Sequence, residues 1–199
     1  MTVDAFPVFI ELTDHLRCPA EHAEQYLVLL PETMDGRRVL SGELGCPVCG
    51  RIVHLVAGAA DFGGGTMSEG RTALSAAAIS AFLGLSGPGG YVALIGGVSS
   101  LAGELASALP DIGLVLVNPP KAAPVEVAGV LRAARLPIKS SSMRGIAVGA
   151  DFAADPDWVK AAARSVLPGL RVVAEGGAPP EELVEVLARS PECWVGRKR

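Results

Sequence analysis

Two short cysteine motifs near the N-terminus constrain the fold of this chain most. Cys46-Pro47-Val48-Cys49-Gly50 places two thiols around a tight turn, and Gly50 permits the left-handed backbone that lets amides point at sulfur. A second turn upstream, Cys18-Pro19-Ala20-Glu21-His22, has the same Leu-x-Cys-Pro opening. The two turns together predict a closed Cys3His zinc site whose ligands are Cys18, His22, Cys46 and Cys49.

The fourth ligand is the least defined part of this site. His15 precedes Cys18 and His54 follows the second motif, so either histidine is an alternative to His22. Four protein ligands leave no open position on the metal, which predicts a structural role for zinc. The competing interpretation is that the cysteines are ordinary buried thiols. Cys193 lies far downstream and is predicted to be a buried strand residue.

Composition excludes several classes of protein. The 199 residues are 50% hydrophobic and 19% charged, which is too apolar for a disordered chain. A net charge of −4 disfavours a non-specific nucleic-acid coat. The most apolar stretches, residues 76–85 and 91–98, are shorter than the ~18–20 residues of a membrane span. The N-terminus lacks the basic region of a signal peptide, so we expect a cytoplasmic protein with reduced thiols.

The segment around the cysteines has a recognisable order. An apolar run at 26–30 leads to an Asp35-Gly36 hairpin signal, then to the second cysteine motif, and then to a strand over 51–56. This order, over about residues 12–62, resembles the small zinc-ribbon family that activates tRNA and protein methyltransferases. That family commonly has four cysteines, and His22 stands here near the expected second one. The resemblance implies a zinc-ribbon domain over residues 1–62.

The remainder of the chain predicts an α/β domain over residues 68–199. After a flexible link at 63–66, apolar runs of strand type alternate with helical patterns. The expected strands are residues 91–95, 113–117, 145–148, 171–174 and 193–195. The expected helices are residues 68–85, 101–109, 125–134, 158–167 and 181–188. This alternation predicts a mainly parallel, doubly wound (Rossmann-like) sheet.

Three phrases resemble class I S-adenosylmethionine-dependent methyltransferases. VALIGGVSS at 92–100 stands where that family has a strand and a glycine-rich loop. LPIKSSSM at 136–143 and RSVLPGLRVV at 164–173 are similar to its approaches to the fourth and fifth strands. The resemblance, over about residues 68–195, implies a methyltransferase-type sheet and S-adenosylmethionine as a cofactor to be considered.

The cofactor positions depart from that family. Gly96 keeps the first loop glycine, but Val98 and Ser100 replace the other two. The residues that the resemblance places at the cofactor are Gly96, Gly97 and Asn118. Asn118 would bond a ribose diol without bringing charge. Asp151, after the expected fourth strand, is the candidate catalytic residue if the domain is active.

Three functions follow from these patterns. We favour a zinc-binding protein with a degenerate methyltransferase-like domain, a non-catalytic pseudoenzyme with a binding or regulatory role. The alternative is an active S-adenosylmethionine-dependent methyltransferase. A third interpretation, an RNA- or nucleotide-binding module with Arg37, Arg38 and Arg51 on phosphate, is disfavoured by the net charge. Because the sequence shows no antiparallel seventh strand, we expect a partner protein or a second copy at the open sheet edge.

Overall fold

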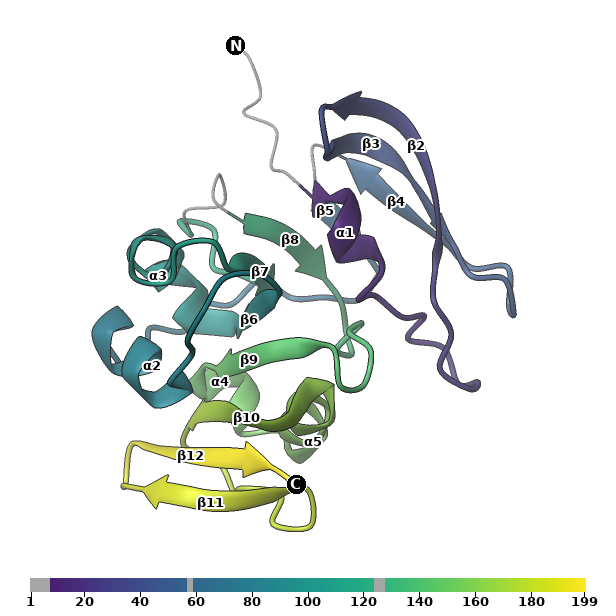
Figure 1. Cartoon of the computed structure of the whole chain (residues 1–199). Coiled ribbons are helices and arrows are strands. Elements are labelled where there is room, and N and C mark those ends of the chain that lie inside the picture. Colours follow the sequence, from purple (N-terminus) through teal and green to yellow (C-terminus); the bar gives the residue numbers. More distant parts are fainter. Residues whose placement is uncertain (1–7, 57–58, 124–127) are drawn as a thin grey trace.

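The computed structural model describes residues 8–56, 59–123 and 128–199, and these form one continuous mixed sheet with helices on both faces (Figure 1). The strands are β1 (Val8–Phe9), β2 (Val28–Asp35), β3 (Arg38–Gly45), β4 (Ile52–Val56), β5 (Ala59–Asp61), β6 (Tyr91–Ile95), β7 (Gly113–Val117), β8 (Ala128–Arg132), β9 (Met143–Val148), β10 (Val166–Glu175), β11 (Val184–Arg189) and β12 (Cys193–Lys198). The helices are α1 (Ile10–Thr13), α2 (Ala76–Leu83), the 3-10 helix η1 (Gly96–Leu101), α3 (Ala102–Ala108), α4 (Ala150–Ala153) and α5 (Pro156–Ser165).

The centre of the sheet is parallel, as the sequence predicts. Its order is β8-β7-β6-β9-β10, and each neighbouring pair runs in the same direction. Strands β6 and β7 have the bounds expected from the sequence. All or nearly all of their residues are buried, because helices or chain segments cover both faces. The mixed α/β, Rossmann-like fold class is therefore confirmed.

The parallel sheet continues into the cysteine-containing module. Strand β5, at the end of that module, pairs in parallel with β8, with Ala60 opposite Leu131. Beyond β5 the sheet continues through β4 and β3, and both β1 and β2 pair with β3. All of these pairs are antiparallel. One sheet thus joins the two predicted domains, and the division at 1–62 and 68–199 stays a prediction about folding units.

The two sheet faces have separate apolar cores. Helices α2 and α3 cover one face, where Ile79 and Leu105 pack with Leu94 and Leu116. Helix α5 and the N-terminal segment cover the other face (Figure 1). On that face Leu16 forms a bridge with Ile138, and the His15 carbonyl accepts a 2.9 Å hydrogen bond from the Lys139 amide. The N-terminal segment therefore takes the place of a covering helix.

Three expected helices are corrected by the structure. The helix expected at 68–85 is only Ala76–Leu83, and Ser75, whose hydroxyl accepts from the Ala78 amide, is its cap. The segment expected to be helical at 125–134 forms strand β8 where it is described, because its apolar run is buried between β5 and β7; residues 125–127 lie outside the described ranges. The helix expected at 181–188 is strand β11, whose alternating Val and Glu residues suit one covered face.

The antiparallel seventh strand that the sequence did not reveal is present. Strand β12 lies between β10 and β11 and runs antiparallel to both. The premise of a missing strand is therefore wrong, and a partner at the sheet edge stays a prediction without that support. Within the described residues, no helix is long and apolar enough to cross a membrane.

Candidate functional site

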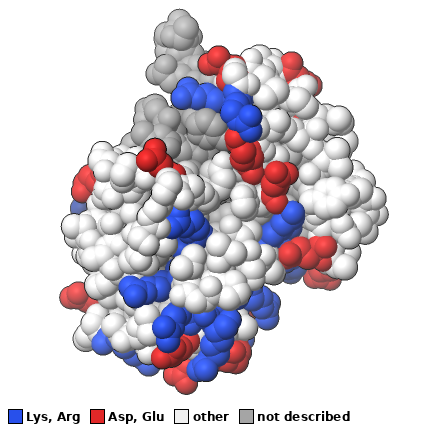
Figure 2. All heavy atoms as spheres, in the orientation of Figure 1, with Lys and Arg blue, Asp and Glu red and all other residues white. Residues whose placement is uncertain are grey.

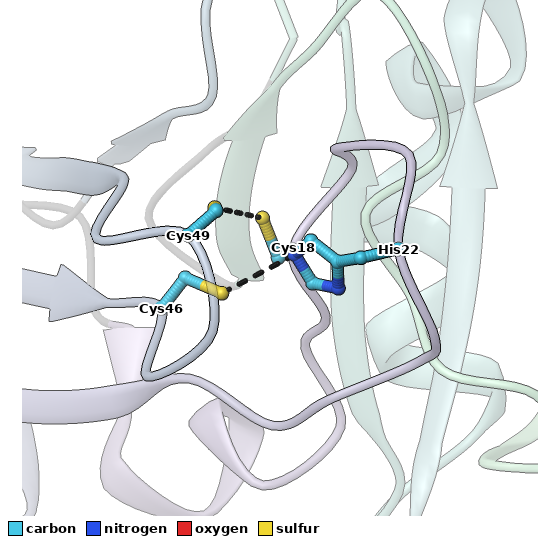
Figure 3. A group of neighbouring side chains, drawn as sticks. All are labelled: Cys18, His22, Cys46 and Cys49. Atoms are coloured by element: carbon cyan, nitrogen blue, oxygen red, sulfur yellow. Dashed lines mark hydrogen bonds between the residues drawn. The ribbon is translucent and has the colours of Figure 1, made fainter.

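The structure brings the four predicted ligands together (Figure 3). The ligand atoms of Cys18, His22, Cys46 and Cys49 all lie within 4.8 Å of one another. The Sγ atoms of Cys18 and Cys49 are 3.7 Å apart, too far for a disulfide, and Cys46 Sγ lies 3.4 Å from His22 Nε2. In a tetrahedron with zinc–sulfur bonds of about 2.3 Å, neighbouring sulfurs are about 3.8 Å apart. The donor set and its spacing fit zinc.

Two tight turns position these side chains. Between β3 and β4, the Cys46 amide donates to the Arg51 carbonyl at 2.8 Å, and the Gly50 amide donates back to the Cys46 carbonyl at 3.0 Å. Gly50 has a φ of +68°, as the sequence predicts for the closing residue of the turn. In the other turn, the His22 amide donates to the Ala20 carbonyl at 2.9 Å. The turns face each other across the cluster (Figure 3).

The imidazole of His22 is oriented for a metal. Its Nδ1 lies 2.7 Å from the Ala23 carbonyl, which can accept only if Nδ1 carries the proton. The Nε2 lone pair is then directed at the cluster. A backbone hydrogen bond that fixes the tautomer in this way is the usual second contact of a zinc-binding histidine.

Two thiols of the cluster, Cys18 and Cys46, have pKa values shifted in opposite directions. Burial raises the pKa of Cys18 to about 11. Burial also acts to raise the pKa of Cys46, but the backbone N–H groups of Cys49 and Val48 outweigh it and bring that pKa to about 6. The pKa of His22 is raised, mainly by its bond to the Ala23 carbonyl. Cys46 is therefore better prepared than Cys18 to be a thiolate before metal arrives.

The two alternative histidines lie elsewhere. The ring of His15 packs edge-on against Tyr91, with centroids 5.2 Å apart. His54, on β4, has its Nδ1 3.5 Å from a Glu43 carboxylate oxygen on β3. Of the three histidines, His22 alone belongs to the cluster. Zinc held here would have four protein ligands and would supply a cross-link between the two turns.

The second group of predicted residues lies at the carboxyl ends of β6 and β9. Gly96 has a φ of +70°, and a Cβ built on it would lie 2.5 Å from Asp151 Oδ1. The Gly97 amide donates to the same oxygen at 3.4 Å. The other oxygen of Asp151 accepts a short hydrogen bond from the Ser68 hydroxyl. Asp151 therefore fills the space in front of the glycine loop.

Asn118 is fully engaged with the chain itself. It ends β7, is 1% exposed, and has a φ of +49°. Its side-chain amide donates to the Ala133 carbonyl at 2.7 Å and accepts from the Ala133 amide at 2.9 Å. Its backbone carbonyl accepts from the Ser68 amide at 3.1 Å. The side chain predicted to meet a ribose instead ties β7 to the segment after β8.

Sequence reasoning missed Glu175, at the end of β10. This carboxylate is 4% exposed and accepts from the Thr72 hydroxyl at 2.7 Å, the Ala73 amide at 2.7 Å and the Leu74 amide at 3.0 Å. Its other oxygen accepts from the Ala150 amide at 3.3 Å. The sequence feature that could have indicated Glu175 is a single acidic residue at the end of an apolar strand, followed directly by two glycines.

These contacts show what covers the carboxyl ends of the parallel strands β6, β7, β9 and β10, here called the carboxyl edge of the sheet. Residues 63–75, here called the linker, cross the ends of β7, β9 and β10, bonded in turn to Asn118, Asp151 and Glu175. These hydrogen bonds come from residues 68–74 of the linker, whereas Gly63, Gly64 and Thr66 are exposed, and the flexible link expected at 63–66 stays a prediction. A Cβ on Gly65 would lie 2.3 Å from the Ala133 amide nitrogen, and one on Gly97 would lie 3.0 Å from Gly70 backbone atoms. In this arrangement the Gly97 amide and the Asn118 side chain are hydrogen-bonded to other residues of the chain, and the assignment of Gly96, Gly97 and Asn118 to S-adenosylmethionine stays a prediction.

No protein-family model and no curated protein matches this sequence. Solved structures with a similar arrangement are methyltransferases. The antibiotic-resistance methyltransferase Kmr has a TM-score of 0.42 and 12% identity, over 67% of this chain and 97% of its own. The precorrin-6y C5,15-methyltransferase of Geobacter metallireducens has a TM-score of 0.45 and 12% identity, over 67% and 94%. A methyltransferase from Aquifex aeolicus has a TM-score of 0.40 and 14% identity, over 56% and 82%. Such values carry no information on activity.

Proposed function

We propose that this chain is a zinc-binding protein whose methyltransferase-like domain works by binding rather than by catalysis. Zinc, held by Cys18, His22, Cys46 and Cys49, has a structural role. The α/β domain is a pseudoenzyme that carries the ribbon and presents it to a partner protein.

One observation carries the proposal: the linker lies where a nucleoside cofactor would have to lie in a sheet of this type. Ligands of open α/β sheets bind at the carboxyl ends of the strands. Here the groups at those ends, Asn118, Asp151 and Glu175, are hydrogen-bonded to the chain's own residues. Asn118 and Glu175 are buried, so leaving either of them without its hydrogen-bond partners would cost about 1–3 kcal/mol.

The outward face of the ribbon supports a role in binding. Strand β2 exposes Val28 and Leu30, and strand β4 exposes Ile52 and Val56, each side chain being at least 45% exposed. Apolar side chains clustered on a surface mark protein interaction sites more often than chance. This agrees with the resemblance of residues 12–62 to subunits that activate methyltransferases. The four free thiols are suited to a reducing compartment, and we place the protein in the cytoplasm.

The alternative function is an active S-adenosylmethionine-dependent methyltransferase. The grouping of Gly96, Gly97 and Asp151 at one edge favours it, since an acid beside a glycine loop is a plausible start for a binding site. That function requires the linker to leave the edge. For the RNA-binding interpretation, Arg37 pairs with Glu11 and Arg51 donates to the Phe62 carbonyl, so both of these side chains already contact other parts of the chain.

Isothermal calorimetry of the zinc-loaded chain with S-adenosylmethionine and with S-adenosylhomocysteine tests the proposal. We expect no binding of either compound up to about 1 mM. A dissociation constant above that concentration corresponds to a binding free energy weaker than about 4 kcal/mol. Micromolar binding of either compound would overturn the pseudoenzyme proposal. The double variant Ser68→Ala/Thr72→Ala, which loosens the linker, provides the comparison: binding gained only in this variant would identify the linker as the obstacle.

A further inference from the structure

A cleft of about 560 Å³ lies on the sheet face opposite α2 and α3. Its walls are α5 on one side, and the β8–β9 connection with Arg17 of the N-terminal segment on the other. The cleft exists because residues 133–142, which connect β8 to β9, contain no helix. The N-terminal segment covers only part of the face that such a helix would cover.

The cleft is lined by more positive than negative side chains. Arg17, Arg135, Lys160 and Arg164 line it, against Asp155 and Asp157. One Asp155 oxygen accepts from the Asp157 amide and caps α5, so this carboxylate is oriented by the helix end. Figure 2 shows Lys and Arg side chains, with Asp and Glu side chains among them, over the lower part of the molecule, where α5 and the C-terminal strands lie.

The positive groups are only partly neutralised. Arg17 has a 3.2 Å ion pair with Glu24, yet its Nε is buried and has no hydrogen-bond partner. Arg135 and Lys160 have longer ion pairs at the surface, 3.4 Å to Glu21 and 3.9 Å to Glu182. Exposed ion pairs of this kind stabilise the folded protein by at most about 1 kcal/mol, so an incoming anion can replace the carboxylate partner.

We propose that this cleft binds a small organic phosphate of about nucleotide size. Guanidinium groups bind phosphate oxygens through paired hydrogen bonds, and arginines from three segments of the chain line this cleft. The volume lies within the range of small-molecule sites. The apolar floor, which includes Leu136 and Trp158, suits the organic part of such a ligand. This site is separate from the carboxyl edge, so it does not depend on the proposed function.

The test is a calorimetric titration of the zinc-loaded chain with adenosine monophosphate and with pyrophosphate, and with adenosine as the uncharged control. We expect both phosphates to bind saturably and adenosine not to bind. In nitrogen–proton spectra, adenosine monophosphate should shift the indole N–H of Trp158, which lines the cleft. The indole of Trp194, bonded to the Gly176 carbonyl, should not move.

Variants locate the binding. Arg164→Gln and Arg135→Gln should each weaken phosphate binding at least tenfold, while Arg189→Gln, the same change on β11 outside the cleft, should leave it unchanged. The Arg135 side chain is 68% exposed, so its variant will fold even where Arg164→Gln does not. No saturable binding of either phosphate up to about 10 mM would overturn the proposal. Equal weakening by Arg189→Gln, or equal binding of adenosine, would overturn it as well.

Discussion

Two glycines with similar backbones differ in what surrounds them. Gly36, in the β2–β3 turn, has a φ of +57° and nothing within 4 Å of a built Cβ. Gly96 has a φ of +70°, but its Cβ would meet Asp151 and Phe152 at 2.5 Å. The first glycine serves the turn alone, whereas the second also makes room for another part of the chain.

Alanine at these two positions measures that difference. Gly36→Ala should lower the free energy of unfolding by about 1 kcal/mol, the cost of a left-handed backbone. Gly96→Ala should lower it by about 2–4 kcal/mol, because overpacking adds to that cost. Urea unfolding followed by circular dichroism gives both values. Equal losses would show that Asp151 does not lie against Gly96.

The histidines give a second prediction at this scale. His22→Ala should lose stoichiometric zinc, because its Nε2 faces the three thiols, while His54→Ala, on the exposed side of β4, should keep it. Metal content after dialysis against a weak chelator is the measurement. Full zinc retention in His22→Ala would remove His22 from the ligand set.

Residue identity predicted the thiol cluster well but the carboxyl edge poorly. The spacing of Cys46 and Cys49 forces them around one turn, so local sequence is enough to place them. The partners of Asn118 and Glu175 come from residues 15 and about 100 positions away, respectively. No local pattern encodes such long-range hydrogen bonds, so the role of Glu175 could not be predicted.

At the scale of elements, the linker is held chiefly by one carboxylate. Glu175→Gln should lower the free energy of unfolding by about 2–3 kcal/mol, because a neutral amide replaces a charged acceptor and turns its NH2 toward a donor. Glu185→Gln is the matched control, because Glu185 makes an exposed ion pair with Arg197 and should have little effect. Thermal and urea unfolding of both variants give the comparison. Indistinguishable stabilities would show that Glu175 does not anchor the linker.

The errors in element type have a common physical cause. Strand β8 and strand β11 both follow patterns that suit a helix locally, and both become strands through pairing with distant segments. Strand β8 is buried between β5 and β7, and among the described strands β11 pairs with β12 alone. Strands β6 and β7, continuous apolar runs bounded by glycine or by Asn118-Pro119, were predictable without that information.

At the scale of the whole molecule, the cysteine-containing module and the α/β sheet share a core. Cys18, Leu44 and Leu55 belong to the same apolar cluster as Val117 and Ile146. Loss of the zinc cross-link should therefore weaken the sheet as well as the ribbon. The two predicted domains would then unfold together.

Zinc removal tests this coupling. Chelation of zinc should lower the melting temperature by about 10 °C or more, since each kcal/mol of lost stability is worth about 2–4 °C in a chain of this size. The fluorescence of Trp158 and Trp194, which lie on the α/β side, reports this melting temperature. Re-addition of zinc should restore it, and the Cys193→Ser variant, outside the cluster, should respond in the same way. An unchanged melting temperature of the tryptophan signal would mean that the two parts unfold independently.

The central claim is that the linker is a fixed layer over the carboxyl edge of the sheet. Amide hydrogen exchange with and without S-adenosylmethionine tests it most directly. The Ser68, Ala73 and Leu74 amides, which donate to Asn118 and Glu175, should exchange nearly as slowly as those of β6 and β7, and the cofactor should not change them. Fast exchange at these amides that slows or shifts when S-adenosylmethionine is added would contradict the claim and identify the linker as a lid over a working site.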